Sequence, residues 1–141
     1  MAAEPFTMDV EAGKVREFAK AVKSGNPANL GRDQPISPPT FLASCAFWQG
    51  PENGPALDAG LDLARVLHGG QEFVFHGPPP RAGTRLTGRS RIDRSYTKEG
   101  RRGGAMTFTE MVTEFRDEAD VLVAEMRSTM IVTSQPPAEG A

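Results

Sequence analysis

The sequence has little cysteine and no long apolar segment, and both absences restrict what the protein is. Its one cysteine, Cys45, has no partner for an internal disulfide, which fits a reducing compartment. No apolar run approaches the roughly 20 residues that a membrane helix needs. Residues 1–7 lack the basic region and apolar stretch of a secretory signal. We therefore expect a cytoplasmic protein that makes no contact with a membrane.

Residues that hold metals, cofactors and nucleic acids are also scarce. Only two histidines occur, His68 and His76, and no paired cysteines accompany them, so the sequence predicts no metal site. It contains no glycine-rich phosphate loop and no nucleophile elbow, so we expect no bound cofactor. The net charge of −2 argues against a general nucleic-acid binder. Cys45 lies within an apolar run, which predicts a small core residue and not a nucleophile.

Positive charge is concentrated in one stretch of the chain. Eight of the sixteen Lys and Arg residues fall between Arg81 and Arg102, and within that stretch only Asp93 and Glu99 oppose them. Such a cluster fits the phosphates of coenzyme A or the surface of an acidic carrier protein. It also fits a solvated strand face that ends in a hairpin. From the sequence both interpretations stay open.

The first half of the chain predicts a short strand and two helices. Residues 6–8 form the strand, and Asp9 is expected to cap a helix with apolar residues at i, i+3, i+4 and i+7, namely Val15, Phe18, Ala19 and Val22. Gly25 and Pro27 are expected to end that helix. Residues 38–48 are apolar nearly all round and begin with prolines, which predicts a buried helix.

The second half predicts strands. A helical turn is expected within residues 57–66, and four strands follow at 72–76, 84–96, 105–116 and 121–133. The Gly-rich segment 98–104 is expected to be a long turn, and residues 117–120 an acidic one. On the last strand an inward face is predicted by the alternation of Leu122, Ala124, Met126, Met130 and Val132. The aromatic side chains expected in the core are Phe41, Phe47, Trp48, Phe73 and Phe75.

Together these elements predict a curved antiparallel sheet wrapped around a central helix, the α+β arrangement called the hot-dog fold. We expect a single domain over residues 1–133 and a disordered tail at 134–141, which is rich in Pro and small residues. One central helix covers only part of a sheet face, so dimerisation through the sheet is expected.

One loop resembles a known catalytic loop. The segment Ser24-Gly25-Asn26-Pro27-Ala28-Asn29 is similar to the Asp-x-Asn-Pro-x-His loop of the MaoC-like (R)-specific hydratases. Asn26 and Pro27 are retained, but Ser24 stands at the Asp position and Asn29 at the His position. Further blocks resemble the non-catalytic branch of that family, meaning the N-terminal half of MaoC dehydratases and the accessory subunits of dehydratase pairs. They are Lys14–Val22, Ser37–Phe41, Leu67–Phe73, Pro80–Gly83, Glu114–Arg116 and Arg127–Thr129.

The resemblance implies a hydro-lyase that exchanges water reversibly with a 2-enoyl thioester. In that family the Asp and His handle water and proton at a dimer interface, and a backbone amide at the start of the buried helix steadies the enolate oxygen. A chain that lacks both groups is expected to be nearly inert alone. The implied function is the substrate-binding subunit of a heteromeric (R)-specific 2-enoyl-thioester hydratase or 3-hydroxyacyl-thioester dehydratase, with the Asp/His pair supplied by a partner subunit.

The same resemblance implies a substrate site without catalytic residues. The expected substrate-binding residues are Asn26, Thr40, His68, Gly69, Gln71 and Arg81. The expected ligand is an acyl-CoA or acyl-carrier-protein thioester. The expected partner is a catalytic MaoC-like subunit in a heterodimer or heterotetramer, with a homodimer as the alternative. Ser24 and Asn29 also suit ordinary turn positions, and His68 also suits a strand-end histidine bonded to a neighbouring carbonyl.

Two other functions remain as alternatives. A hot-dog acyl-CoA thioesterase commonly uses a carboxylate on or near the buried helix, and residues 34–51 contain no Asp or Glu, which disfavours it. A non-catalytic acyl-CoA-binding module would share the fold and the ligand. It would differ from a dehydratase subunit in having no catalytic partner that it activates.

Overall fold

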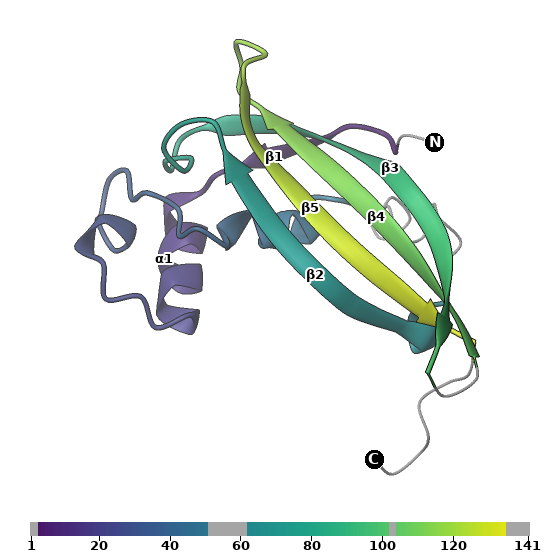
Figure 1. Ribbon diagram of the computed structural model, residues 1–141. Coiled ribbons are helices and arrows are strands. Elements are labelled where there is room, and N and C mark those ends of the chain that lie inside the picture. Colours follow the sequence, from purple (N-terminus) through teal and green to yellow (C-terminus); the bar gives the residue numbers. More distant parts are fainter. Residues whose placement is uncertain (1–2, 51–61, 102–103, 135–141) are drawn as a thin grey trace.

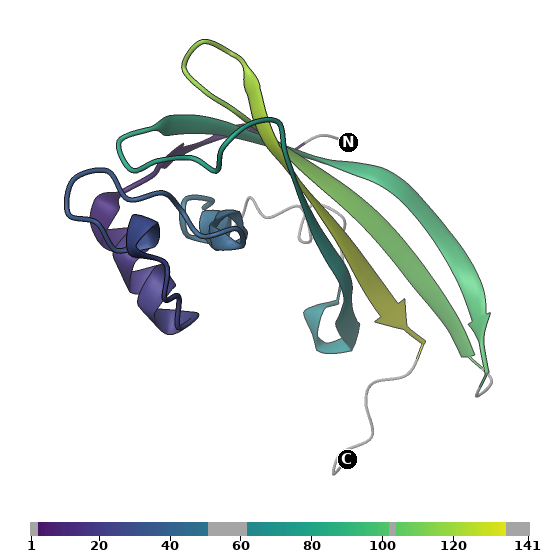
Figure 2. The same cartoon turned by 60° about the vertical axis from the view of Figure 1, so that its left-hand side comes forward.

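The hot-dog fold predicted from the sequence is confirmed. The computed structural model describes residues 3–50, 62–101 and 104–134. One five-stranded antiparallel sheet, ordered β1-β3-β4-β5-β2, curls around a layer of helical segments (Figures 1 and 2). Its strands are β1 (Phe6–Asp9), β2 (Val66–Phe75), β3 (Arg85–Gly100), β4 (Gly104–Arg116) and β5 (Leu122–Thr133). The helical segments are α1 (Ala12–Ala21) and the 3₁₀ helices η1 (Pro27–Asn29), η2 (Phe41–Phe47) and η3 (Leu63–Arg65).

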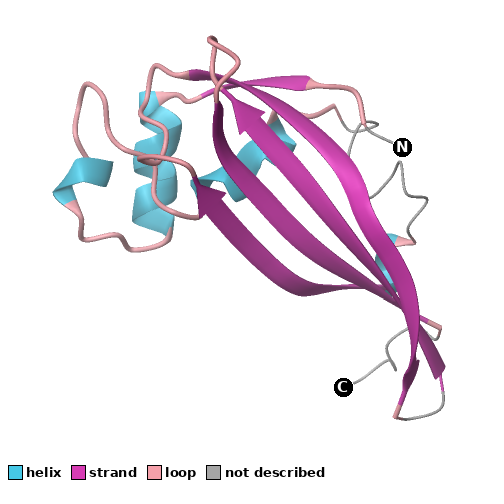
Figure 3. Cartoon of the chain, turned by 45° about the horizontal axis from the view of Figure 1, so that its top comes forward, coloured by secondary structure: helices cyan, strands magenta, loops and turns pink. Residues whose placement is uncertain are grey.

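Strand β4 defines the two faces of the sheet, because its residues alternate without a bulge of their own. Its odd-numbered side chains turn toward the helices: Phe115 belongs to the buried core, and Met111 and Thr113 are also buried. Its even-numbered side chains, among them Glu110 and Glu114, turn to the outer face. The core therefore lies between the inner face and the helical layer, which Figure 3 separates by colour.

The helix after β1 is shorter than predicted at both ends. Asp9 does not cap it: Asp9 ends β1 and its carboxylate binds Arg85 at 2.7 Å, while Glu11 is the N-cap and makes no side-chain bond. At the other end Lys23 has φ 55°, a left-handed conformation that stops the helix. Val22 therefore lies beyond α1 and is 49% exposed, whereas Val15 and Ala19 are buried as predicted.

The buried helix is present as the seven-residue 3₁₀ helix η2. Phe41, Leu42 and Cys45 join the core, and burial raises the pKa of the Cys45 thiol to about 12, so its predicted role as a core residue is confirmed. The prediction for Phe47 is wrong, because its side chain is 84% exposed. η2 packs on the core through Phe41, Leu42 and Cys45, whereas Phe47 at its last position lies outside that contact. Trp48, Phe73 and Phe75 pack against the core while partly buried.

Two strands extend further than the sequence pattern predicted. β2 begins at Val66 and not at residue 72, and the predicted turn at 98–104 is partly strand, since Gly100 pairs with Gly104. A Cβ on Gly100 would lie 2.9 Å from the Gly104 carbonyl oxygen, so glycine permits this close approach. Of the helical turn expected within 57–66, residues 57–61 lie outside the described residues, and Leu63–Arg65 forms η3. The expected tail lies outside them from residue 135 onward.

Candidate functional site

The loop that resembles a catalytic loop leaves α1 through a tight, hydrogen-bonded turn. The Ser24 amide donates to the Ala19 carbonyl oxygen at 2.8 Å, which closes the end of the helix. Asn26 then caps η1, because its side-chain oxygen accepts a bond from the Ala28 amide at 3.0 Å, and Pro27 occupies the first helical turn. Asn26 thus holds the shape of the loop, and its predicted contact with substrate stays a prediction.

Ser24 and Asn29 face each other across this loop. The Ser24 hydroxyl donates to Asn29 Oδ1 at 2.8 Å, and Asn29 Nδ2 donates to the Ile36 carbonyl oxygen at 2.7 Å. The Asn26 amide donates back to Ser24 Oγ at 3.2 Å. Asn29 is only 5% exposed. Neither a serine hydroxyl nor a carboxamide ionises near neutral pH, so this pair can orient groups but is not suited to act as acid and base.

The segment between Asn29 and Phe41, here called the strap, joins this loop to the start of η2. The Ile36 amide donates to the Ala28 carbonyl oxygen at 2.8 Å, and Ile36 also forms a bridge with Arg81. The Ser37 amide donates to the Pro80 carbonyl oxygen at 3.0 Å. Arg81 Nη1 donates to the Gln34 carbonyl oxygen at 3.2 Å, while the residue remains exposed. Arg81 therefore braces the strap, and its predicted contact with a phosphate stays a prediction.

The start of η2 is less open than the resemblance suggested. Thr40 is its N-cap but makes no side-chain capping bond and is exposed. The Phe41 amide already donates to the Pro38 carbonyl oxygen at 3.0 Å, so that amide is not free to bind a substrate oxygen without a rearrangement. The Ser37 hydroxyl is buried and has no hydrogen-bond partner among the described residues. Sequence analysis did not single it out, because burial of a lone serine has no sequence signal.

His68, Gly69 and Gln71 lie together on β2. His68 Nε2 is 3.1 Å from Gln71 Oε1, which also accepts a bond from the Ser128 hydroxyl at 2.9 Å. Since this oxygen can only accept, the His68 nitrogen must be the donor, given that orientation of the amide. Among the described residues, no carboxylate is hydrogen-bonded to this cluster. A Cβ on Gly69 would lie 2.6 Å from the Ile131 side chain, so packing against Ile131 already explains the glycine.

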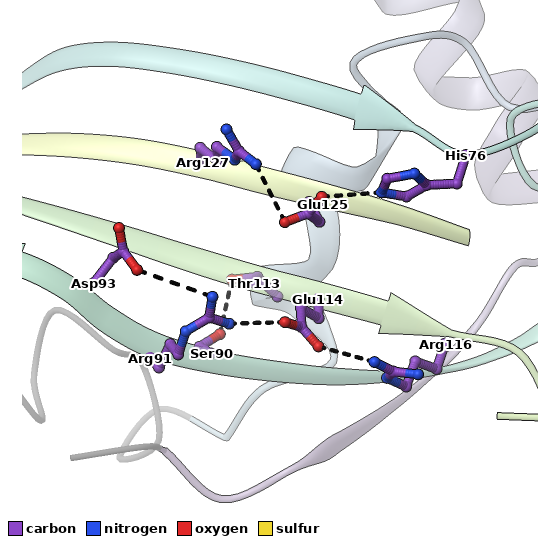
Figure 4. A network of polar contacts seen from close by, with 9 residues as sticks. All are labelled: His76, Ser90, Arg91, Asp93, Thr113, Glu114, Arg116, Glu125 and Arg127. Atoms are coloured by element: carbon purple, nitrogen blue, oxygen red, sulfur yellow. Dashed lines mark hydrogen bonds and ion pairs between the residues drawn. The ribbon is translucent and has the colours of Figure 1, made fainter. Parts of the chain in front are cut away.

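A histidine–carboxylate pair does occur in the chain, on the outer face of the sheet. His76 Nε2 is 2.9 Å from Glu125 Oε2, and this hydrogen bond is the main cause that lowers the pKa of Glu125. Figure 4 shows the pair beside Glu114 and Arg127, with a helical segment behind the sheet. The pair is thus separated by the sheet from the loop and from η2. Sequence analysis missed it because strands β2 and β5 are distant in the chain and their register was not predictable.

Much of the basic cluster is neutralised by carboxylates outside the stretch 81–102. Arg85 binds Asp9 at 2.7 Å, Arg91 binds Glu114 at 2.9 Å, and Arg94 binds Glu110 at 2.8 Å, two of these pairs being on adjacent strands β3 and β4. The bonds with arginine lower the pKa of Asp9 and of Glu110. These contacts favour the interpretation of the cluster as a solvated, ion-paired strand face.

In the part of the chain that the structure describes, no group of three or more His, Cys, Asp or Glu side chains is placed to hold a metal ion. No helix in the described ranges is both long and apolar enough to cross a membrane.

The sheet, the helical layer and the loop define the class of protein: a hot-dog protein of the MaoC-like dehydratase type. The chain belongs to the family described as FAS1-like, dehydratase domain region, whose sequence profile matches residues 1–126. It is 41% identical over 99 residues to UPF0336 protein SCO4636 of Streptomyces coelicolor, covering 63% of this chain and 65% of that protein. It is 33% identical over 146 aligned positions to UPF0336 protein Franean1_6066 of Parafrankia, covering 94% and 91%. The chain thus spans about two thirds of the Streptomyces relative's length.

Solved structures give the same fold. The HadBC (3R-hydroxyacyl-ACP dehydratase) complex of Mycobacterium tuberculosis contains a chain 29% identical, with a TM-score of 0.65 and coverage of 93% and 94%. The ChsH1–ChsH2 complex of the same organism gives 16% identity, a TM-score of 0.68 and coverage of 96% and 87%. R-hydratase PhaJ1 of Pseudomonas aeruginosa gives 14% identity, a TM-score of 0.64 and coverage of 96% of this chain and 81% of that chain. The last two likenesses show the fold alone. HadBC and ChsH1–ChsH2 are complexes, so similar proteins assemble into heteromers.

Proposed function

We propose that this chain is the substrate-binding subunit of a heteromeric (R)-specific 2-enoyl-thioester hydratase or 3-hydroxyacyl-thioester dehydratase. The observation that carries the proposal is the hydrogen-bonded pair Ser24–Asn29, 2.8 Å apart, at the two positions where catalytic relatives of the resembled family carry Asp and His. Family membership and the likeness to a chain of the HadBC complex support the reaction class.

The chemistry assigns different tasks to the two subunits. Hydration of a 2-enoyl thioester needs one group to deprotonate water and one to protonate the α-carbon, and general acid–base groups each contribute about a hundred- to ten-thousand-fold. This chain offers the Ser24–Asn29 pair in the loop after α1 and the His68–Gln71–Ser128 cluster on strands β2 and β5, and both are suited to hydrogen bonding. The partner's Asp/His pair performs the proton transfers, and this chain binds and orients the acyl thioester.

The proposed substrate site consists of the residues that the family resemblance implies. Asn26 shapes the loop, and Thr40 at the start of η2 is assigned to the thioester carbonyl, where the Phe41 amide could bind only after it releases the Pro38 carbonyl oxygen. His68 and Gln71 provide polar contacts at the β2 edge, where Gly69 allows close packing. Arg81, exposed beside the strap, is assigned to a phosphate of the acyl carrier.

An assay with and without the partner tests the function. The partner for this assay is to be sought among the MaoC-like chains of the same genome, as one that carries an intact Asp-x-Asn-Pro-x-His loop. We expect negligible hydration of crotonyl-CoA or a longer 2-enoyl-CoA by the isolated chain, and turnover by the reconstituted complex. Release of free CoA by the isolated chain would instead indicate the thioesterase alternative. Binding of the acyl-CoA without turnover in any mixture would indicate the non-catalytic binding module.

A further inference from the structure

Strand β2 contains a bulge directly after His68, and this bulge changes which side chains share a face. In a regular strand, residues three apart point to opposite faces of the sheet. The extra residue, Gly69, removes that offset, so His68 pairs with Met130 and Gln71 pairs with Ser128. Both partners on β5 pair in turn with odd-numbered residues of β4, so all four side chains lie on the inner face. The bulge therefore places the His68 ring beside the Gln71 amide.

Three hydrogen bonds define the orientation of the Gln71 amide. Its nitrogen, Nε2, donates to the Arg127 carbonyl oxygen at 3.3 Å, and a flipped amide would place two oxygens against each other there. Its oxygen, Oε1, therefore faces the Ser128 hydroxyl at 2.9 Å and His68 Nε2 at 3.1 Å. An amide oxygen only accepts hydrogen bonds, so His68 Nε2 carries the hydrogen.

The other ring nitrogen of His68, Nδ1, is consequently an acceptor in the neutral side chain. No described residue forms a hydrogen bond with it. His68 is exposed near the start of β2, whereas Phe73 and Phe75, toward the other end of the strand, pack against the core (Figure 1). The inner face thus presents one acceptor that has no partner among the described residues, beyond the part of the sheet that the core fills.

The inner face around His68 combines hydroxyl and apolar side chains and carries no charge. The cross-strand row of His68 continues through Met130, Thr109 and Ser95. The two adjacent rows consist of Val66, Val132, Thr107 and Thr97 on one side and Gln71, Ser128, Met111 and Ile92 on the other. Because no carboxylate in these rows would neutralise a cationic donor, the acceptor suits a neutral donor such as a hydroxyl group. The methionine and valine side chains suit an alkyl chain.

We infer that His68 determines substrate specificity by accepting, at Nδ1, a hydrogen bond from a hydroxyl group on the acyl part of the thioester. The inference rests on the proposed function, in which the partner's Asp/His pair acts at the 3-hydroxyl group. The hydroxyl that His68 binds is therefore a second one, further along the acyl chain. The thioester lies at the start of η2, and the acyl chain runs along the inner face toward the start of β2. The substrate class is a hydroxylated acyl thioester and not a plain alkyl one.

The test compares 2-enoyl-CoA substrates of about 8 to 16 carbons with their ω-hydroxylated forms, using the full chain reconstituted with its catalytic partner. At the best-fitting length we expect the added hydroxyl to raise kcat/KM about two- to tenfold, the range of one neutral hydrogen bond. Isothermal titration calorimetry of the same pairs of acyl-CoA ligands gives a second readout that does not depend on turnover.

Two variants of His68 separate the acceptor from the rest of the ring. In His68→Asn the side-chain oxygen replaces Nδ1 as an acceptor. In His68→Gln the amide nitrogen replaces Nε2, which keeps the donor toward Gln71 but leaves no acceptor at the Nδ1 position. We expect the preference for the hydroxylated substrate to persist in the Asn variant and to disappear in the Gln variant. Circular dichroism melts of each isolated variant check that it is folded.

The tautomer gives a readout on the full chain alone. Nitrogen NMR should find the hydrogen of neutral His68 on Nε2, and a hydrogen on Nδ1 overturns the inference. Equal kcat/KM for hydroxylated and parent substrates at every length overturns it too, as does a preference that the Gln variant retains. Failure of the proposed function looks different, since the complex would then hydrate no 2-enoyl thioester. In that case calorimetry decides: tighter binding of the hydroxylated acyl-CoA supports the role of His68, and equal binding overturns it.

Discussion

Asn29 accepts a hydrogen bond from the Ser24 hydroxyl and donates one to the Ile36 carbonyl oxygen. One buried carboxamide thus connects the end of α1 to the strap before η2. Two residues that stand at catalytic positions of the resembled family have thus become part of the scaffold. Their loop keeps its shape through hydrogen bonds in which no group titrates near neutral pH. This arrangement separates the shape of the site from its proton chemistry, and the two can be tested separately.

Replacing Asn29 by Ala tests the scaffold. The change removes the partner of the Ser24 hydroxyl and leaves the partly buried Ile36 carbonyl oxygen unpaired, so the free energy of unfolding should fall by about 1–3 kcal/mol. Urea denaturation measures this difference. Ser24→Ala is the matched control: it leaves the Asn29–Ile36 bond in place, and we expect the smaller loss of about 0.5–1.5 kcal/mol. Equal effects of the two variants would contradict the central position of Asn29.

Restoring the acid–base pair tests whether the frame of a catalytic loop has survived. We expect the double variant Ser24→Asp/Asn29→His to hydrate crotonyl-CoA at least about a hundredfold above the unchanged isolated chain, since one positioned acid–base group contributes at least that much. Each single variant should fall well below the double variant, because only one of the two acid–base groups is then present. A folded double variant without activity would show that the loop, or the start of η2, no longer has a catalytic geometry.

The sequence predicted the fold well because its two periodicities are clear. Ala124 of β5 and Val15 and Ala19 of α1 are buried as these patterns predicted, and Met126 packs against the core. The absence of an acid–base pair in the loop could also be predicted, since it depends on residue identity alone. The ends of helices and strands could not be predicted. Gly100, for example, continues a strand only through its pairing with Gly104, which no local pattern reveals.

The electrostatics could not be predicted for the same reason. Counting charges near Arg85 and Arg94 along the chain found few carboxylates, yet Asp9 and Glu110 bind them from neighbouring strands. The pairing of His76 with Glu125 likewise depends on the register of β2 against β5. The sequence thus identified which residues carry charge, whereas only the register of the paired strands showed which residue each one contacts.

The ion pair between Arg94 and Glu110 makes stability depend on pH at the acid end. The hydrogen bond from Arg94 lowers the pKa of Glu110 in the folded chain. Its stabilising contribution is therefore complete above the unfolded pKa of about 4.3 and is lost as pH falls through the lower folded value. We expect Arg94→Gln to reduce the urea midpoint at pH 7 and to leave it unchanged near pH 2, so the two curves converge on acidification. Parallel curves would contradict the pairing, and Lys23→Gln is the control.

The thiol of Cys45 gives a prediction at the alkaline end. Burial raises its pKa to about 12, so the folded chain keeps the thiol protonated and shielded. Iodoacetamide at pH 8 should modify Cys45 only at the rate at which the chain opens, and urea should accelerate the reaction sharply. This group stabilises the fold at pH values below the unfolded thiol pKa of about 8.5, and the contribution falls as pH rises above it. Rapid labelling of the folded chain, followed by mass spectrometry, would contradict its place in the core.

Arg81 tests whether the basic cluster recognises phosphate. Its guanidinium contacts a backbone carbonyl, that of Gln34, and the residue is exposed, whereas Arg94 is held by the carboxylate of Glu110. If Arg81 meets a phosphate of the acyl carrier, Arg81→Glu should weaken binding of an enoyl-CoA to the assembled complex, and the difference should shrink between 50 mM and 500 mM salt because counterions screen it. Arg94→Glu is the matched control with the same change in net charge, and we expect it to alter binding much less. Isothermal titration calorimetry measures both. Equal affinities of the Arg81 variant and the unchanged chain at low salt would leave the cluster as a solvated strand face.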